Sequence, residues 1–287
     1  MQWKHGYRLF LPLLLALAPA APAAVPVAID GAGESLQQAL EQALKEQEFE
    51  PAGYDEAELL VVVGPEAFRR ALDGDRPVMA LHVPRAELLD AWRDGCTCTG
   101  LFPETDPALQ LRLIRELLPR ATRVGLILAD ESAWAEGYLP GYARRLDLEL
   151  EVRRIPDRTA LGEALAELVP EVDVLLAVTD RELYSAATAR QVLLSGYRQN
   201  RPVVGPDRRF VDAGSAASIH HAPEALAREA AAILARLRDQ GRLPAPDFPE
   251  DFSLVLNKQV LETLDLPVGD LERLERRLQV QKREVRP

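Results

Sequence analysis

Residues 99–128, TGLFPETDPALQLRLIRELLPRATRVGLIL, decide the fold class of this chain. They begin inside one apolar run at 96–102, continue through an amphipathic stretch at 107–118, and end in a second apolar run at 123–128. Neither run alternates between apolar and polar residues, as expected for strands buried on both faces. A helix between two such strands is typical of parallel strands joined by a crossover, so this stretch predicts an α/β fold.

The same alternation of short apolar runs and helical patterns continues in both directions. Further strands are predicted at 25–29, 59–63, 77–83, 148–155, 173–178, 202–204, 216–220 and 252–257. Helices are predicted at 34–48, 159–168, 185–199, 223–238 and 258–266, and a short one at 271–278 precedes a basic tail. We therefore expect parallel sheets covered by helices.

The first 23 residues have the pattern of an export signal. Lys4 and Arg8 precede an apolar core at 9–18 that is too short to span a bilayer, and two small-x-small cleavage sites follow at 18–20 and 21–23. No cysteine is placed there to accept a lipid. The sequence predicts an exported, periplasmic protein without a lipid anchor.

Charge limits the classes of partner. The formal net charge of −11 becomes −13 over the remaining 264 residues, because both charges in the first 23 are positive. An acidic chain argues against nucleic acid or an anionic membrane as a main partner. No later run offers the roughly 18 apolar residues that a membrane span needs.

Enzyme and cofactor motifs are missing from the sequence. We find no Gly-x-Ser-x-Gly, His-Glu-x-x-His or phosphate-binding Gly-x-x-x-x-Gly-Lys, and the DGAG turn at 30–33 lacks the third glycine of a dinucleotide site. His220 and His221 cannot both point inward from one strand, so they predict no metal site. We expect a protein that is not an enzyme and holds no metal or cofactor.

Turns from strand to helix supply the candidate ligand-binding residues, because such turns line the ligand-binding edge of an open parallel sheet. The candidates there are Asp30, Gly31, Gly64, Pro65, Glu66, Asp130, Ser132, Thr179 and Asp180. The helix start at Gly64 would favour a ligand carboxylate, although Glu66 could equally be the cap. Plain helix capping stays an alternative for each turn.

The order of these pieces resembles a known family. Thr99-Gly100, LIRELLP at 113–119 and RVGLIL at 123–128 are similar to the "TG…LLKELLP…RVGVL" run of ABC transporter substrate-binding proteins of the tryptophan/tyrosine type. The similarity continues through VDVLLAV at 172–178, RPVV at 201–204, VDAGSAAS at 211–218 and LVLN at 254–257.

The resemblance implies a type I periplasmic-binding-protein fold, in which two Rossmann-like lobes close on a small ligand. Lobe 1 would hold residues 25–122 and 216–242, lobe 2 would hold 123–215 and 250–266, and 267–287 would form a C-terminal helix and tail. The stretch 34–48 runs almost directly into the strand at 59, so the first lobe is expected to lack one strand-helix unit.

The resemblance also extends the list of candidate site residues. Asp130, Asp180 and Asp207 would gather on lobe 2, where carboxylates could hold a ligand amine or simply cap helices. His220 would lie on a crossover strand beside the cleft, and Trp134 could stack on a ligand or pack in the core.

Cys96 and Cys98 are one residue apart. On a regular strand their Cα atoms would stand roughly 6.5 to 7 Å apart, at the limit for a disulfide, so a bridge needs a bend. The family commonly has a buried valine at the second position, which favours a small apolar strand residue over a disulfide.

The sequence therefore predicts an exported solute-binding protein of an ABC uptake system, with an amino acid or similar small molecule as ligand and an ABC permease as partner. The alternative is a degenerate binding-protein fold that serves as a sensory or interaction module for an envelope partner, which the shortened first lobe and the basic tail motivate.

Overall fold

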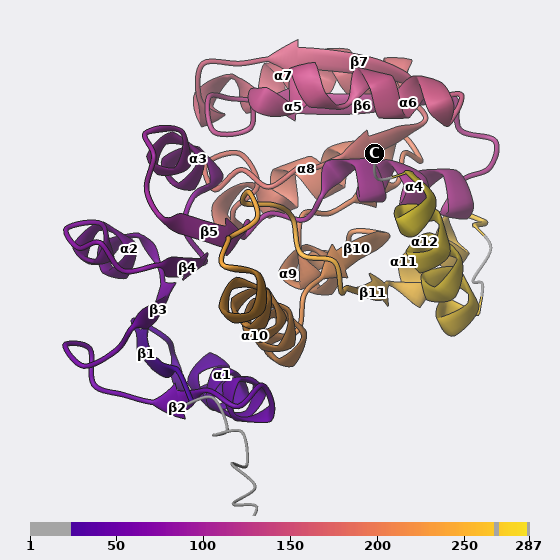
Figure 1. Ribbon diagram of the computed structural model, residues 1–287. Coiled ribbons are helices and arrows are strands. Elements are labelled where there is room, and N and C mark those ends of the chain that lie inside the picture. The colour runs from indigo at the N-terminus through magenta and orange to yellow at the C-terminus, as the bar shows by residue number, and fades with distance from the viewer. Residues whose placement is uncertain (1–23, 267–269, 286–287) are drawn as a thin grey trace, which may run out of the picture.

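Apolar strands form two separate sheets in the computed structural model, which describes residues 24–266 and 270–285, with side chains as far as residue 279 (Figure 1). The predicted signal peptide, 1–23, lies outside the described residues, as do 267–269 and 286–287 of the predicted tail. Nearly all strand pairs are parallel, which confirms the predicted α/β class.

Lobe 1 has a five-stranded parallel sheet in the order β2-β1-β3-β4-β5, a doubly wound order. Its strands are β1 (Pro26–Asp30), β2 (Glu50–Pro51), β3 (Leu59–Val63), β4 (Val78–Leu81) and β5 (Cys98–Leu101). Helices α1 (Glu34–Glu46) and α10 (Pro223–Gln240) cover one face, and α2 (Pro65–Ala71) and α3 (Arg85–Arg93) cover the other. Alternate residues of β3 therefore enter two different cores.

Lobe 2 has a six-stranded sheet in the order β11-β10-β9-β8-β6-β7, and only β11 is antiparallel to its neighbour. Its strands are β6 (Arg123–Leu128), β7 (Glu149–Arg154), β8 (Val174–Leu176), β9 (Val203–Val204), β10 (Ala217–His220) and β11 (Ser253–Leu256). On one face lie α4 (Pro107–Leu117), α5 (Trp134–Tyr138), α6 (Pro140–Arg145) and α12 (Leu271–Val285), and on the other α7 (Leu161–Leu168), α8 (Ala186–Arg198) and α9 (Arg208–Ala213). Short elements complete the chain: α11 (Lys258–Thr263) and the 3-10 turns Arg158–Ala160 and Val169–Glu171.

Two segments belong to a different lobe from the one predicted. Helix α4, assigned to lobe 1, packs in the lobe 2 core, where Ile114 and Leu117 are buried with Val124 of β6. Strand β10, also assigned to lobe 1, pairs with β9 and β11 in the lobe 2 sheet. The prediction of α10 in lobe 1 agrees with its packing on α1. The crossovers therefore lie after β5, after β10 and before β11.

The first lobe is shortened, but less than predicted. The two-residue strand β2 remains and pairs with β1 through Pro26 and Val27. What is absent is the helix after it, since residues 52–58 form turns that lead directly to β3. The guanidinium of Arg76 donates to the carbonyl oxygens of Tyr54 and Ala57 and lies over the Tyr54 ring, so it fastens this loop where the helix would stand.

The cysteines differ from the favoured expectation, because Cys96 and Cys98 form a disulfide. Their Cα atoms are 5.2 Å apart, closer than on a regular strand, because β5 begins only at Cys98 and Gly95 has φ of +93°. A bend of this kind brings the two side chains within bonding reach. Cys98 is nevertheless buried in the core, as the favoured reading of a small apolar strand residue expected.

The helix predicted at 271–278 is present as α12, which lies beside α4 in Figure 1. It continues to Val285, so most of the predicted tail is helical. Leu274 and Leu278 are buried in the lobe 2 core, and Arg277 forms an ion pair of 2.8 Å with Glu116 of α4. The helix is therefore part of lobe 2. In the described ranges, no helix has both the length and the apolar character that crossing a bilayer requires.

Candidate functional site

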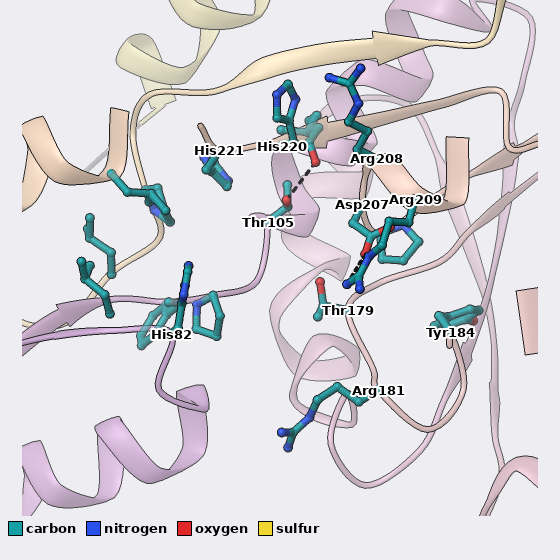
Figure 2. A pocket seen from close by; sticks show the side chains of 18 of the residues that line it. His82, Thr105, Thr179, Arg181, Tyr184, Asp207, Arg208, Arg209, His220 and His221 are labelled. Carbon is teal, nitrogen blue, oxygen red and sulfur yellow. Dashed lines mark hydrogen bonds and ion pairs between the residues drawn. The ribbon is translucent and has the colours of Figure 1, made fainter. Parts of the chain in front are cut away.

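A cavity of about 420 Å³ lies where the two lobes and their crossovers meet (Figure 2). Lobe 1 contributes the ends of β4 and β5, and lobe 2 contributes the loops after β8 and β9 and the end of β10. The residues lining it are Leu81, His82, Leu101, Phe102, Pro103, Thr105, Thr179, Asp180, Arg181, Tyr184, Pro206, Asp207, Arg208, Arg209, Ile219, His220, His221, Leu226 and Pro249. Its volume lies within the range of about 300 to 1,000 Å³ that is usual for small-molecule sites.

Four of the predicted binding residues line this cavity: Thr179, Asp180, Asp207 and His220. All four follow or end strands of lobe 2, at the edge where strand-to-helix turns were expected to meet a ligand.

Asp180 is used mainly inside its own loop. Its side chain is only 2% exposed, and one oxygen accepts hydrogen bonds from the backbone N–H groups of Glu182 and Leu183 at 3.1 and 3.0 Å. The other oxygen accepts from the hydroxyl of the fully buried Ser132 at 2.8 Å. Ser132 therefore stands behind the cavity wall and holds the loop that carries Thr179.

Asp207 is also engaged locally. One oxygen accepts the backbone N–H of Phe210 at 3.0 Å and caps α9, and the other pairs with the guanidinium of Arg209 at 3.1 Å. Asp130 is exposed and does not line the cavity, while its neighbour Glu131 pairs with Arg181 at 2.8 Å. The capping and pairing alternative therefore accounts for Asp180 and Asp207.

The predicted residues of lobe 1 lie outside the cavity. Asp30 ends β1 and forms an ion pair with Arg70 at 2.7 Å. Gly31 has φ of +82°, and a Cβ there would be 3.0 Å from the side chain of Ala67, so glycine allows the turn to pack on α2. Gly64 has φ of +87° and precedes α2, which begins with Pro65 and Glu66. These turns line the same edge of the sheet at β1 and β3, away from the cavity beside β4 and β5.

Trp134 contributes to the contact between the lobes instead of lining the cavity. The guanidinium of Arg85, from α3 of lobe 1, lies 4.3 Å from the centre of the Trp134 ring on α5 of lobe 2. Phe248 of the last crossover packs against both Trp134 and Phe102, with ring centres 5.9 and 5.1 Å apart. This aromatic cluster joins both lobes to a crossover.

Glu104, in the first crossover, lies beside this cluster. It is 6% exposed, and burial raises the pKa of its carboxyl, which the nearby Arg85 opposes only in part. Burial likewise lowers the pKa of Arg85. The two side chains thus carry opposite charges in a poorly solvated place.

Three of the chain's four histidines line the cavity, a concentration that sequence reasoning found only for His220. His82 follows β4 with φ of +53°, an uncommon conformation for a residue other than glycine. The protein around it lowers the pKa of its imidazole by desolvation, although part of the ring reaches the cavity. The sequence prediction placed His82 inside the strand at 77–83, whereas β4 ends at Leu81.

His220 and His221 connect two crossovers. Nδ1 of His220 lies 3.1 Å from the carbonyl oxygen of Ser253, and Nδ1 of His221 lies 2.7 Å from that of Asp251. A carbonyl oxygen only accepts, so each Nδ1 is the donor. The hydroxyl of Thr105 in the first crossover donates to the carbonyl of Ile219 at 3.3 Å. The base of the cavity is therefore built from all three crossovers.

Tyr184 is a further lining residue, whose signal in the sequence is an aromatic side chain able to stack on a ligand or fill an apolar wall. Its hydroxyl donates to the carbonyl of Ile127 at 2.8 Å, and burial raises the pKa of the phenol.

Among the described residues, no group of three or more histidine, cysteine, aspartate or glutamate side chains is placed to hold a metal ion.

Two sheets of mostly parallel strands, three crossovers and a cavity at their junction define the class of two-lobed periplasmic-binding-protein folds. A model of the family described as "ABC transporter substrate binding protein" matches residues 75–273, and the chain belongs to this family. The resemblance read from the sequence is confirmed at this level, whereas the tryptophan/tyrosine type stays a prediction.

Solved structures support the same fold. The ligand-free, open structure of a substrate-binding protein with adhesive properties from Clostridium difficile has a TM-score of 0.67 at 16% identity, over 86% of this chain and 97% of that one. An ABC domain from Streptococcus pneumonia in complex with L-Trp has a TM-score of 0.57 at 16% identity, over 86% and 96%. A periplasmic ribose ABC transporter protein from Conexibacter woesei has 0.50 at 13%, over 88% and 98%. A search of curated proteins gives no significant match.

Proposed function

We propose that the chain is the exported, ligand-binding component of an ABC uptake system, and that it binds a small organic solute, of the size of an amino acid, between its lobes. The observation that carries this proposal is a cavity walled by both lobes and based on all three crossovers. A ligand there touches both lobes and the segments about which they would turn.

Binding by lobe closure also gives a role to the lobe 1 turns that lie outside the cavity. Gly64 and Asp30 stand at the carboxyl edge of the same sheet as His82, which does line it. Rotation about the crossovers would bring that edge toward the loops of Thr179 and Asp207. The proposed partner is an ABC permease, which would receive the closed form, and the proposed action involves no chemical conversion.

The test is a thermal-shift screen of the purified protein against amino acids, carboxylates and sugars, followed by small-angle X-ray scattering. A true ligand raises the melting temperature in proportion to the logarithm of its concentration and reduces the radius of gyration. A ligand that binds without any compaction would contradict closure. The binding function would be contradicted if no compound raised the melting temperature and the freshly purified protein retained no small molecule.

A further inference from the structure

We propose that the solute held by the inter-lobe cavity carries net negative charge, as an organic dicarboxylate or a phosphorylated small molecule does. The inference rests on the proposed binding function and names the chemical class of its ligand. It is supported by the charge of the lining, by the local engagement of the lining carboxylates, and by the positions of the histidines.

The cavity lining is cationic although the chain is anionic. The whole sequence has 34 lysine and arginine residues against 45 aspartate and glutamate residues. The lining reverses this ratio with three arginines, Arg181, Arg208 and Arg209, against two aspartates, Asp180 and Asp207. Three histidines, His82, His220 and His221, add further polar groups. A local excess of positive charge in an acidic protein raises the local concentration of anions.

Neither lining carboxylate is placed to bind a ligand amine. Asp180 is buried and already accepts three hydrogen bonds, from Ser132 and from two backbone N–H groups. Asp207 caps α9 and pairs with Arg209. A zwitterion would leave its ammonium group without a carboxylate partner here, which disfavours a neutral amino acid relative to an anion.

The arginines keep donors for a ligand. Arg181 uses Nε for Glu131, and Arg209 uses Nε and Nη2 for Asp207, so each retains at least one terminal nitrogen with free N–H groups. Among the described residues, no carboxylate lies within ion-pair distance of Arg208. Guanidinium groups bind carboxylate and phosphate oxygens through paired hydrogen bonds.

The two sides of the cavity are chemically different (Figure 2). His82 stands on the lobe 1 side, while Thr179, Arg181 and Arg209 stand on the lobe 2 side. Between them, the Nδ1 hydrogen of His220 is fixed on Ser253, which leaves Nε2 for a ligand oxygen or hydroxyl. An elongated anion could therefore place an acidic group at the arginines and a second polar group at a histidine.

The remaining lining indicates an organic solute. Leu101, Phe102 and Ile219 supply apolar surface, and the volume of about 420 Å³ exceeds what a bare inorganic ion fills. Apolar walls with a few placed polar groups are usual for organic ligands.

The experiment uses matched pairs of probes that differ in charge: succinate and succinamide, L-glutamate and L-glutamine, glucose 6-phosphate and glucose, with inorganic phosphate as a further arm. Binding to the purified full chain is measured by isothermal titration calorimetry. We expect at least one anion to bind and its neutral partner to bind at least 10-fold more weakly, because one lost ion pair in a closed site changes affinity by about that factor.

Arg209→Gln is expected to weaken the anion about 10-fold while the protein stays folded, since its exposed ion pair with Asp207 contributes little stability. Arg190→Gln, on the exposed side of α8 and outside the lining, is the matched control and should leave the affinity unchanged.

The outcomes separate the two proposals. A neutral probe that binds as well as its anion, or an anion whose affinity is the same in Arg209→Gln, overturns the anionic class and leaves the binding function standing. If all probes fail, native mass spectrometry of the freshly purified protein decides: a retained molecule of net negative charge supports the inference, and a neutral or cationic one overturns it. If the purified protein retains no molecule at all, this result counts against both proposals.

Discussion

Replacing Gly100 by alanine tests the packing of the stretch that decides the fold. Gly100 lies in β5 opposite Ala80 of β4. A Cβ at this position would be 2.7 Å from Cδ2 of the buried Leu88 and 3.0 Å from Cβ of Ala80, and it would also collide with the carbonyl oxygen of Ala80. That oxygen belongs to the backbone of a central strand and cannot turn aside as a side chain can.

The size of the effect follows from two opposing terms. Overpacking a well-filled core costs about 1 to 3 kcal/mol, and the backbone collision places this site at the upper end. Alanine also restricts the unfolded chain, which returns about 0.4 to 1 kcal/mol. We therefore expect Gly100→Ala to lower the free energy of unfolding by about 2 kcal/mol.

The assay is urea unfolding followed by far-ultraviolet circular dichroism. Gly137→Ala is the matched control, because Gly137 lies in helix α5 and a Cβ there would meet no atom within 4 Å. The control should be neutral or stabilising by up to about 1 kcal/mol from helix propensity. A loss below about 0.5 kcal/mol for Gly100→Ala, with an unchanged denaturant slope, would refute the close approach of β5 to β4 and α3.

Three further changes address other parts of the molecule. Ser132→Ala should lower the free energy of unfolding by about 2 kcal/mol in urea titrations, because it removes a buried donor to the Asp180 carboxylate; no change would contradict that hydrogen bond. Glu104→Gln should stabilise the protein by about 1 kcal/mol at pH 7, since burial raises the pKa of Glu104 and the ionised form is costly. Wild type gains stability as the pH falls through that raised pKa, so the difference in melting temperature should shrink toward pH 4; a constant difference would count against this cause. Thiol titration of the unfolded, unreduced protein should find no reactive thiol, because Cys96 and Cys98 are bridged, whereas two thiols per chain would refute the disulfide.

The positions of the strands could be predicted closely because each buried run is continuous and apolar. The runs at 59–63 and 123–128 coincide with β3 and β6. The sequence could not predict which lobe α4 belongs to. Helical periodicity shows that a helix has an apolar face, but it does not show which sheet that face packs against. The disulfide is hard to predict for a related reason: two cysteines at this spacing lie too far apart on a regular strand, and the bend at Gly95 that brings them together depends on its surroundings.

The candidate site could be predicted in part. Turn chemistry pointed to the loops of Thr179 and Asp207, and both loops line the cavity, because parallel strands present their following turns on one edge. It could not tell which turns of lobe 1 share the cavity, since that depends on the angle between the lobes. Nor could it recognise His82, because the distinctive feature of His82 is a positive φ that follows from packing. The sequence left open whether the carboxylates of lobe 2 hold a ligand amine or cap helices. In the structure Asp180 and Asp207 already have hydrogen-bond and arginine partners, which is why we propose an anionic ligand.

The pairing of α1 with α10 has a consequence for biogenesis. Arg238 of α10 donates to the carbonyl oxygen of Gln47 at 2.6 Å, across 191 residues of chain, and the two helices share one core. A ribosome must therefore complete all of the lobe 2 sheet up to β10 before the first helix can meet its partner. Until then Leu36 and Leu40 have no cover from α10, so the amino-terminal half of a nascent chain keeps apolar surface exposed that chaperones can bind.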